Sequence, residues 1–227
     1  MATVALIYCG GGNPRFATIA HEAGFLYGAQ LPGSLASLPL YFADQDWKRP
    51  RRTAYMRALD RHRPQIATVL DWEHDDQWRE VLDWAEEAAQ YAFSVMIIPK
   101  VVEGLERIPE TIGGVPVVIG YSVPTKHGAT CVPIWELAGR KVHLLGGSPH
   151  RQRREYHAIS GVANVISVDG NMAMKMAVRH CQYWIERPQS TGYWVALRPA
   201  SEDAPYEAFR RSCANIRKAW GVKELMR

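Results

Sequence analysis

The sequence predicts a compact (β/α)8 barrel, the TIM-barrel fold of the α/β class, formed by a single catalytic domain of 227 residues. Three observations lead to this prediction. Short Val- and Ile-rich apolar runs recur eight times, helix-like segments lie between several of them, and no Ser-, Gly- or Pro-rich linker divides the chain. Hydrophobic residues make up 47% of the sequence, which is enough for one sizeable core.

Each predicted strand is a nearly continuous apolar run that ends at a turn or polar residue, as is typical of parallel strands buried on both faces. In chain order, the eight strands are predicted at 3–10, 24–30, 38–45, 66–72, 94–100, 116–122, 141–147 and 164–171. A doubly wound open sheet is the alternative, because a strand count that is wrong by one would leave the sheet open.

The predicted helices have apolar residues at three- and four-residue spacing. In "DDQWREVLDWAEEAAQYA" one face carries Trp78, Val81, Leu82, Ala85 and Ala89. Four further helices are predicted at 52–62, 132–139, 149–159 and 171–186, whereas the first two connections are short or irregular. The tail, 203–227, is predicted to add an amphipathic helix that packs on the outside of the barrel.

The charge is mildly basic, at +4 with a pI near 8.9, and does not by itself indicate nucleic-acid binding. Its distribution is more informative. The runs "WKRPRR", "RALDRHRP" and "HRQRR" are basic, and "DWEHDDQWRE" and "DWAEEA" are acidic. Any one of these runs taken alone is best interpreted as a solvated helix face.

The four cysteines are scattered along the chain, without a CxxC motif or a Cys/His cluster, so we expect neither a structural zinc nor another cofactor. Scattered thiols suit a reducing cytoplasm. The N-terminal segment lacks the basic region of a signal peptide, and no apolar run is long enough to span a bilayer. We therefore expect a cytoplasmic protein without a membrane partner.

Polar residues follow the predicted strands, where the active site of a barrel forms. Three strands end in an acidic residue: Asp44 (with Asp46 close by), Asp71 and Asp169. An Asp at this place can also be the N-cap of the next helix. Other polar residues at these ends are candidate substrate contacts: Asn13, Lys100, Tyr121, Ser122, Lys126, His127 and Asn171.

The segment "KVHLLGGSPHRQRREY" suggests a phosphate site after the seventh strand. Glycines allow close approach of backbone N–H groups, and a helix N-terminus adds positive potential. The predicted contacts are Gly146, Gly147, Ser148, His150 and Arg151. An ordinary capped helix explains the Ser-Pro pair equally well, but explains the glycines and His150 less well. For "GGGNPRF", a tight turn and a phosphate cradle remain equally good interpretations.

A phosphate site beside paired carboxylates favours a nucleotide or a phosphorylated sugar as substrate. Paired carboxylates suit glycosidic chemistry, in which one attacks or stabilises the anomeric carbon and the other transfers protons. A polymeric substrate would need its base turned out of the stack to reach such a site.

Five segments between residues 38 and 176 occur in a familiar order: "YFADQD", "IATVLDWE", "VVIGYS", "VHLLGGSPHRQ" and "GVANVISVDGN". This order resembles the tRNA-guanine transglycosylase superfamily, especially its shorter DNA-acting branch. The resemblance implies that Asp169 is the nucleophile, that Asp44 (or else Asp46) is the general acid/base, and that Asp71 contacts the base. It also implies that a backbone phosphate is held by Gly146, Gly147 and His150.

The sequence also departs from this family. The zinc site and its surrounding domain are missing, "IIPK" around Lys100 replaces the guanine-reading "VQGG", and Tyr121 replaces the second glycine of "IGGL". The pocket for an incoming deazaguanine is therefore not preserved, which favours water as the acceptor. In this respect the chain resembles phage-defence DNA glycosylases, which remove modified bases from viral DNA.

The leading hypothesis is a DNA glycosylase that cleaves the N-glycosidic bond of a flipped-out, modified base in phage DNA and leaves an abasic site, a base-excision reaction of antiviral defence. The basic groups expected to hold DNA phosphates are Arg49, Arg51, Arg52 and 151–154. The alternatives are a DNA or tRNA transglycosylase that inserts a 7-deazaguanine, a barrel enzyme for a free nucleotide or sugar phosphate, and a non-catalytic nucleic-acid-binding domain. The base, the strandedness of the substrate and the oligomeric state stay open.

Overall fold

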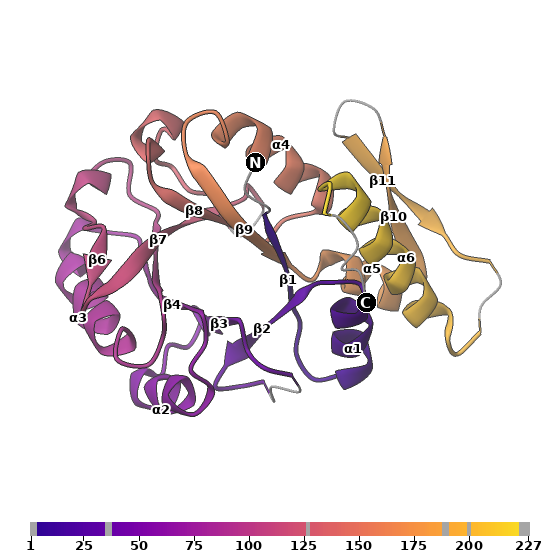
Figure 1. Ribbon diagram of the computed structural model, residues 1–227, viewed down its shortest axis with the longest axis horizontal. Coiled ribbons are helices and arrows are strands. Elements are labelled where there is room, and N and C mark those ends of the chain that lie inside the picture. The colour runs from indigo at the N-terminus through magenta and orange to yellow at the C-terminus, as the bar shows by residue number, and fades with distance from the viewer. Residues whose placement is uncertain (1–3, 35–37, 126–127, 188–190, 199–200, 223–227) are drawn as a thin grey trace.

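The computed structural model describes residues 4–34, 38–125, 128–187, 191–198 and 201–222 (Figure 1). Nine strands form one sheet in the order β5-β4-β3-β2-β1-β9-β8-β7-β6, and pairing of β5 with β7 closes this sheet into a barrel. All pairs within the barrel are parallel, and only the short β6 (Thr111–Ile112) adds antiparallel to β7. The predicted TIM-barrel fold is confirmed, and the closure excludes the open doubly wound sheet.

The parallel strands are β1 (Ala5–Cys9), β2 (Leu26–Leu31), β3 (Phe42–Gln45), β4 (Ile66–Trp72), β5 (Val95–Pro99), β7 (Val115–Ser122), β8 (Lys141–Leu145) and β9 (Asn164–Gly170). Each one coincides, within a residue or two at its start or end, with a predicted apolar run or a part of it. The agreement follows from the burial of both faces, because a strand between a barrel interior and a helix layer has little place for polar residues.

Four helices cover the outside of the barrel: α1 (Pro14–Glu22), α2 (Arg52–His62), α3 (Trp78–Ala88) and α4 (Pro149–Ile159). The bounds of α2 and α4 are those predicted. After β5 and β7 the chain instead forms the 3₁₀ turns η2 (Leu105–Arg107) and η3 (Ile134–Leu137). The helix predicted at 132–139 was therefore wrong: Pro133 precedes the turn, and Gly139, with φ of 73°, follows it.

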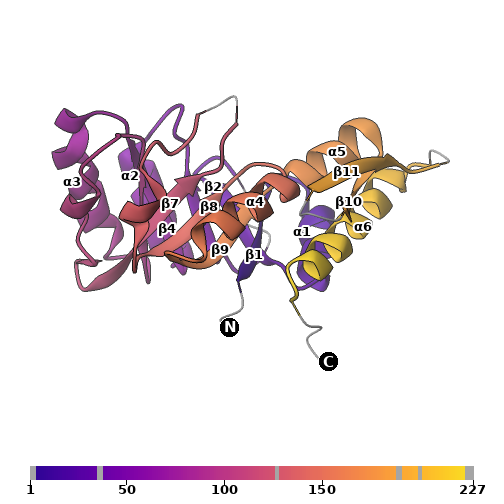
Figure 2. The same ribbon diagram turned by 90° about the horizontal axis from the view of Figure 1, so that it is seen from above.

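The chain after β9 forms a small unit beside the barrel (Figure 2), made of α5 (Met172–His180), the hairpin β10 (Gln182–Arg187) and β11 (Thr191–Ala196), and α6 (Ala204–Ala219). The single helix predicted at 171–186 was wrong in its second half. Cys181 adopts φ of 48° and ends α5, and the strand that follows buries Trp184 completely. The backbone of Trp184 accepts from Asn215 and donates to Ser212 of α6.

Helix α6 packs on α1, α5 and β10, and its residue Phe209 contacts the rings of Tyr8 and Phe16, at 5.2 Å and 5.3 Å between centroids. The tail prediction extended to residue 227, and its last five residues lie outside the described residues. The unit thus covers the barrel wall where β1 and the first helix meet.

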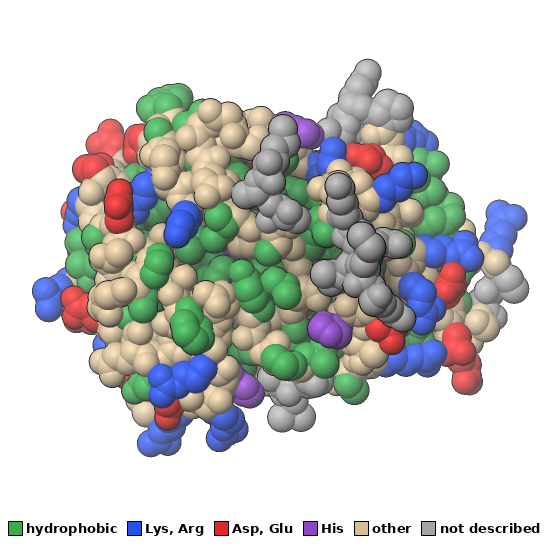
Figure 3. All heavy atoms as spheres, viewed as in Figure 1, with side chains coloured by type: hydrophobic (Ala, Val, Ile, Leu, Met, Phe, Trp, Pro, Cys, Tyr) green, Lys and Arg blue, Asp and Glu red, His purple; other side chains and the backbone are tan. Residues whose placement is uncertain are grey.

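The barrel interior holds its own apolar cluster: Ile7, Cys9, Phe42, Ile66, Met96, Ile98 and Val118. Figure 2 places the start of β1 on the side of the molecule that faces the viewer in Figures 1 and 3. On that face, uncharged side chains, many of them hydrophobic, occupy the centre, and most charged ones lie at the periphery (Figure 3). Polar chemistry therefore has to be sought at the other end, where the strands finish. We call that end the mouth of the barrel.

Candidate active site

Successive side chains of a strand point to opposite faces, so the inward direction of the apolar cluster identifies the inward polar residues. Asp44 follows the inward Phe42 by two positions on β3. Asp169 pairs in register with the inward Ile7. The same argument places Ser122 inside, two positions beyond Gly120 and four beyond Val118. The mouth is therefore lined with acidic and hydroxyl groups above an apolar floor.

Asp169 is held in place by two neighbours on the β8 side. Its Oδ1 accepts from the backbone N–H of Gly146 at 3.1 Å and lies 3.1 Å from Nε2 of His143. The side chain is about 10% exposed. Both contacts use the same carboxylate oxygen, which fixes the plane of the group.

Asp44 shares the mouth with Asp169. Burial raises the pKa of the Asp44 carboxyl well above its ordinary value, the charges of Asp169 and Asp71 raise it further, and a hydrogen bond from Thr68 opposes them. Thr68 is itself fixed, because its Oγ1 accepts from the N–H of Gln45 at 2.7 Å. Two acids that lie far apart in the sequence are thus close enough in space for the charge of Asp169 to affect the ionisation of Asp44.

The third acid, Asp71, belongs to a separate group on β4, β5 and β7. Its Oδ2 lies 4.0 Å from Nζ of Lys100, which donates to Oγ of Ser122. Burial raises the pKa of Asp71 to about 6, against the opposing effect of Lys100. This group offers a hydrogen-bond acceptor and donors side by side.

Cys9 lies beside the first pair of acids. Burial raises the pKa of its thiol well above its usual range, as do the charges of Asp169 and Asp44 and a hydrogen bond with Asp169. A thiol kept protonated in this way is a poor nucleophile, so Cys9 acts here as a hydrogen-bonding neighbour of Asp169.

The double-glycine loop after β8 has a different role from the predicted one. Gly146 and Gly147 have φ of 66° and 81°, and a Cβ on Gly147 would lie 2.6 Å from Cγ1 of Val123. The N–H of Gly146 donates to Asp169, so the predicted phosphate contact of this residue is not supported by a free N–H. The Gln152 side chain donates to the carbonyls of Gly146 (2.8 Å) and Asp169 (2.7 Å) and so joins the ends of β8 and β9.

The remaining residues of this loop contact each other or the neighbouring loop. Ser148 is buried, and its Oγ lies 3.1 Å from Nε2 of His150. Burial, helped by the charges of Arg151 and Arg154, lowers the pKa of His150, which disfavours the cationic form. Arg151 donates to the carbonyl of Pro124 at 2.9 Å.

Several other predicted residues lie away from the acids. The side chain of Asn13 caps α1 and donates to the hydroxyl of Tyr206. Tyr121 points outward, 3.5 Å from Glu155, because it is one position out of phase with Ser122. The side chain of Asp46 accepts from the N–H of Lys48 in an exposed turn, and Asn171 takes the N-cap position of α5. Lys126 and His127 lie outside the described residues.

Sequence reasoning missed Thr68, His143 and Ser167, although a signal was present. All three are polar residues inside apolar runs, where an unpaired polar group is costly. Each lies within a predicted strand, so its presence there already implies a buried partner.

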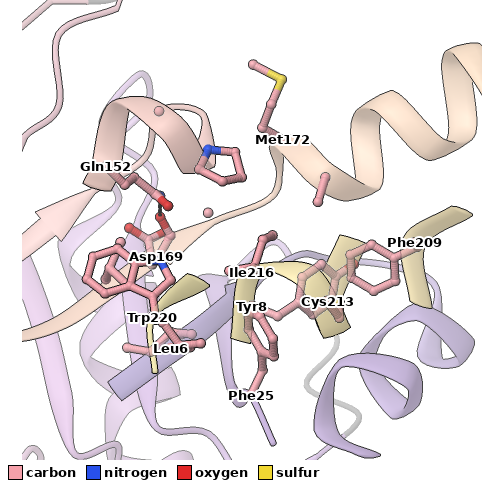
Figure 4. A pocket seen from close by; sticks show the side chains of 16 residues that line it. Leu6, Tyr8, Phe25, Gln152, Asp169, Met172, Phe209, Cys213, Ile216 and Trp220 are labelled. Carbon is pink, nitrogen blue, oxygen red and sulfur yellow. Dashed lines mark hydrogen bonds between the residues drawn. The ribbon is translucent and has the colours of Figure 1, made fainter. Parts of the chain in front are cut away.

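A cavity between β1, β9, α5 and α6 includes Asp169 and Gln152 in its lining (Figure 4). Apolar and aromatic side chains dominate its lining, among them Tyr8, Phe25, Phe209 and Trp220. Among the described residues, no group of three or more His, Cys, Asp or Glu side chains has a metal-binding arrangement. No described helix is both long and apolar enough to cross a membrane.

Residues 20–221 match DUF6610, a family of unknown function, and the chain belongs to that family. No curated protein matches the sequence. Among solved structures, mutually generated monomers of the dimeric phosphoribosylanthranilate isomerase of Thermotoga maritima align with 12% identity over 94% of this chain and 98% of that chain. The TM-score of this alignment is 0.38, too low to bear on activity.

Proposed function

We propose that this member of DUF6610 is a DNA glycosylase that cleaves the N-glycosidic bond of a flipped-out, modified base and leaves an abasic site. The observation that carries the proposal is the pairing of Asp44 and Asp169 in one mouth, in unlike surroundings. Burial and neighbouring carboxylates favour the protonated form of Asp44, whereas Asp169 receives hydrogen bonds on one oxygen. Carboxyl pairs whose environments differ in this way are suited to separate acid and nucleophile roles.

In the proposed reaction, Asp44 donates its proton to the departing base while the C1′–N bond breaks. The second oxygen of Asp169, Oδ2, forms a bond to C1′ or stabilises the positive charge that develops there. Asp44, now a carboxylate, takes a proton from a water molecule, whose oxygen attacks C1′ and releases Asp169. The products are the free base and a sugar that carries a hydroxyl at C1′.

The group of Asp71, Lys100 and Ser122 supplies base recognition in this proposal. Its residues lie on β4, on β7 and directly after β5, whereas the reacting pair lies on β3 and β9. Its carboxylate would accept from an N–H of the base, and its ammonium would donate to a base carbonyl. The hydroxyl of Ser122 orients the ammonium.

The DNA backbone is assigned to the loop between β3 and α2. Trp47 is 46% exposed there, with Nζ of Lys48 5.2 Å from its ring, and Arg49 and Arg51 are exposed. Exposed aromatics among cations suit stacked bases and phosphates. Two of the other expected phosphate ligands are engaged elsewhere: Arg52 pairs with Glu87 and Arg153 with Glu186.

The test is mass spectrometry of small products after incubation with unmodified and heavily modified phage DNA. Release of a base, with abasic sites left in the DNA, is the expected result. Asp169→Asn and Asp44→Asn should each lower the rate by roughly 10²–10⁴-fold. Asp60→Asn, which alters an exposed acid paired with Arg63, is the matched control and should retain the wild-type rate.

The outcomes distinguish the alternatives. Replacement of the lost base by a deazaguanine would establish the transglycosylase, and turnover of a free nucleotide without DNA would establish the small-molecule enzyme. If either acid variant works at the wild-type rate, its assigned role is wrong.

A further inference from the structure

A buried chain of polar side chains runs beneath the mouth, inside the barrel. Nδ1 of His143 lies 2.7 Å from Oγ of Ser167, and Nε2 of the same ring lies 3.1 Å from Oδ1 of Asp169. His143 and Ser167 are both 0% exposed. The imidazole stacks on Phe42, with 4.9 Å between ring centroids and 22° between the planes.

The partners define where the hydrogens are. A carboxylate oxygen only accepts, so Nε2 of His143 carries the hydrogen that faces Asp169. Nδ1 faces the hydroxyl of Ser167, which can donate to a nitrogen lone pair or accept from an N–H. Both ring nitrogens therefore have a partner, and the two contacts fix the orientation of the ring.

These hydrogen-bonded polar side chains are unusual because the barrel interior around them is apolar. The rest of the inner cluster is apolar, with Ile7, Phe42 and Ile66 among its members. An aromatic hydrocarbon side chain at position 143 would satisfy this environment without the desolvation cost of burying an imidazole and a hydroxyl. The contact that only a histidine provides is the one to Oδ1 of Asp169.

We propose that His143, itself held by Ser167, is a positioning residue that fixes Oδ1 of Asp169 and directs Oδ2 toward the anomeric carbon. The role of Asp169 in this inference rests on the proposed glycosylase function. The backbone N–H of Gly146 binds the same oxygen from the loop side. Two donors on Oδ1 set the rotation of the carboxylate and so the direction of its other oxygen.

Kinetics provide the first test. His143→Phe keeps the ring stack on Phe42 but removes the donor, and should lower kcat about 100-fold, the size of effect expected for a misplaced reacting group, with KM nearly unchanged. Ser167→Ala should lower kcat roughly 10-fold, the equivalent of one buried hydrogen bond. Ser212→Ala is the matched control: it also removes a fully buried serine hydroxyl, but in α6, where that hydroxyl accepts from the N–H of Trp184.

An equal fall of kcat in Ser167→Ala and Ser212→Ala, or a wild-type kcat in His143→Phe, would overturn the positioning role. A rise of KM without loss of kcat would also overturn it. Melting temperatures of all three variants separate a loss of folding from a loss of rate.

A second readout does not depend on any activity. In ¹⁵N-detected spectra, the ring of His143, assigned by its loss in His143→Gln, should carry a hydrogen on Nε2. Asp169→Ala should release that hydrogen and allow both tautomers. An unchanged ring signal in Asp169→Ala contradicts the inference. If the ring responds but no base is ever released from DNA, the positioning contact stands and the glycosylase proposal fails.

Discussion

Asp44 and Asp169 carry the same functional group but differ in what surrounds them. Asp169 receives two donors on one oxygen, whereas Asp44 faces other carboxylates and little solvent. The positions of both acids at strand ends followed from the alternation of apolar runs and Asp residues. Their different environments did not, because the partners of Asp169 come from β8 and the loop after it, and the register between β8 and β9 cannot be inferred from either segment alone.

The raised pKa of Asp44 predicts that this residue lowers the stability of the protein at neutral pH. Its pKa in the folded state is above that in the unfolded chain, so any stability gained from holding the proton is present at low pH and is lost as the pH rises through the folded value. Asp44→Asn should therefore raise the melting temperature at pH 8, by ~2–4 °C for each kcal/mol relieved. At pH 4 the difference should shrink. A lower melting temperature for this variant at pH 8 would contradict the prediction.

The pKa of about 6 at Asp71 predicts an acid limb in the activity profile. Asp71 is the stronger hydrogen-bond acceptor for the base when it is ionised, so kcat/KM should fall as the pH drops through about 6. Asp44 must be protonated, so activity should also fall at high pH, as the pH passes its raised pKa. Measurement of kcat/KM from pH 5 to pH 9 tests both limbs. The acid limb should disappear in Asp71→Asn, and its persistence there would assign it to another group.

At the scale of elements, strands that are buried on both faces could be predicted from the sequence. Strands with one buried and one partly exposed face could not. The barrel strands are apolar on both faces, and all eight lie at or within a residue of the predicted runs. The strand β10 is different: Trp184 faces α6, while Tyr183 and Ile185 on the other face are only partly buried. It follows α5 after a single residue, so the predicted helix was extended beyond the true end of α5 into this strand. Tyr121 shows that the direction of a single side chain is equally hard to predict. Whether the side chain points into the barrel or outward depends on the strand register, which the sequence does not give.

Helix α6 should depend strongly on its aromatic contact with the barrel. Phe209 is 2% exposed between the rings of Tyr8 and Phe16. Phe209→Ala should lower the free energy of unfolding by about 3–5 kcal/mol, because it leaves a cavity beside an existing one. Denaturant unfolding measures this loss. Phe93→Ala, at a residue that is 61% exposed, is the matched control and should change stability little.

At the scale of the whole molecule, cations lie at both ends of α2, but the two groups belong to opposite ends of the barrel. The loop that precedes this helix, with Lys48, Arg49 and Arg51, follows the end of β3 and so lies at the mouth. The last turn of α2, with Arg61, returns to the opposite end, because β3 and β4 are parallel. Cations at the mouth are thus positioned to meet a phosphate backbone whose base enters the barrel.

This arrangement predicts salt-dependent DNA binding through the β3–α2 loop. The triple variant Lys48→Ala, Arg49→Ala and Arg51→Ala should weaken binding of a labelled oligonucleotide. It should also reduce the slope of log K against log salt by up to about 2–3 units, because each phosphate that a cation neutralises adds about one unit to the slope. Arg57→Ala with Arg61→Ala changes exposed arginines on the same element away from the mouth and should leave the slope unchanged. A wild-type slope in the triple variant would remove this loop from the interface.

The start of β1 and the end of α6 lie on the side of the molecule away from the mouth (Figure 2). Strand β1 begins at the end of the barrel remote from the carboxylates, and α6 finishes on that side too (Figure 2). A surface anchor or a fluorescent fusion attached before β1 or after α6 should therefore leave the entrance for a nucleic acid unobstructed. The protein can thus be immobilised in a defined orientation for single-molecule recordings of DNA capture.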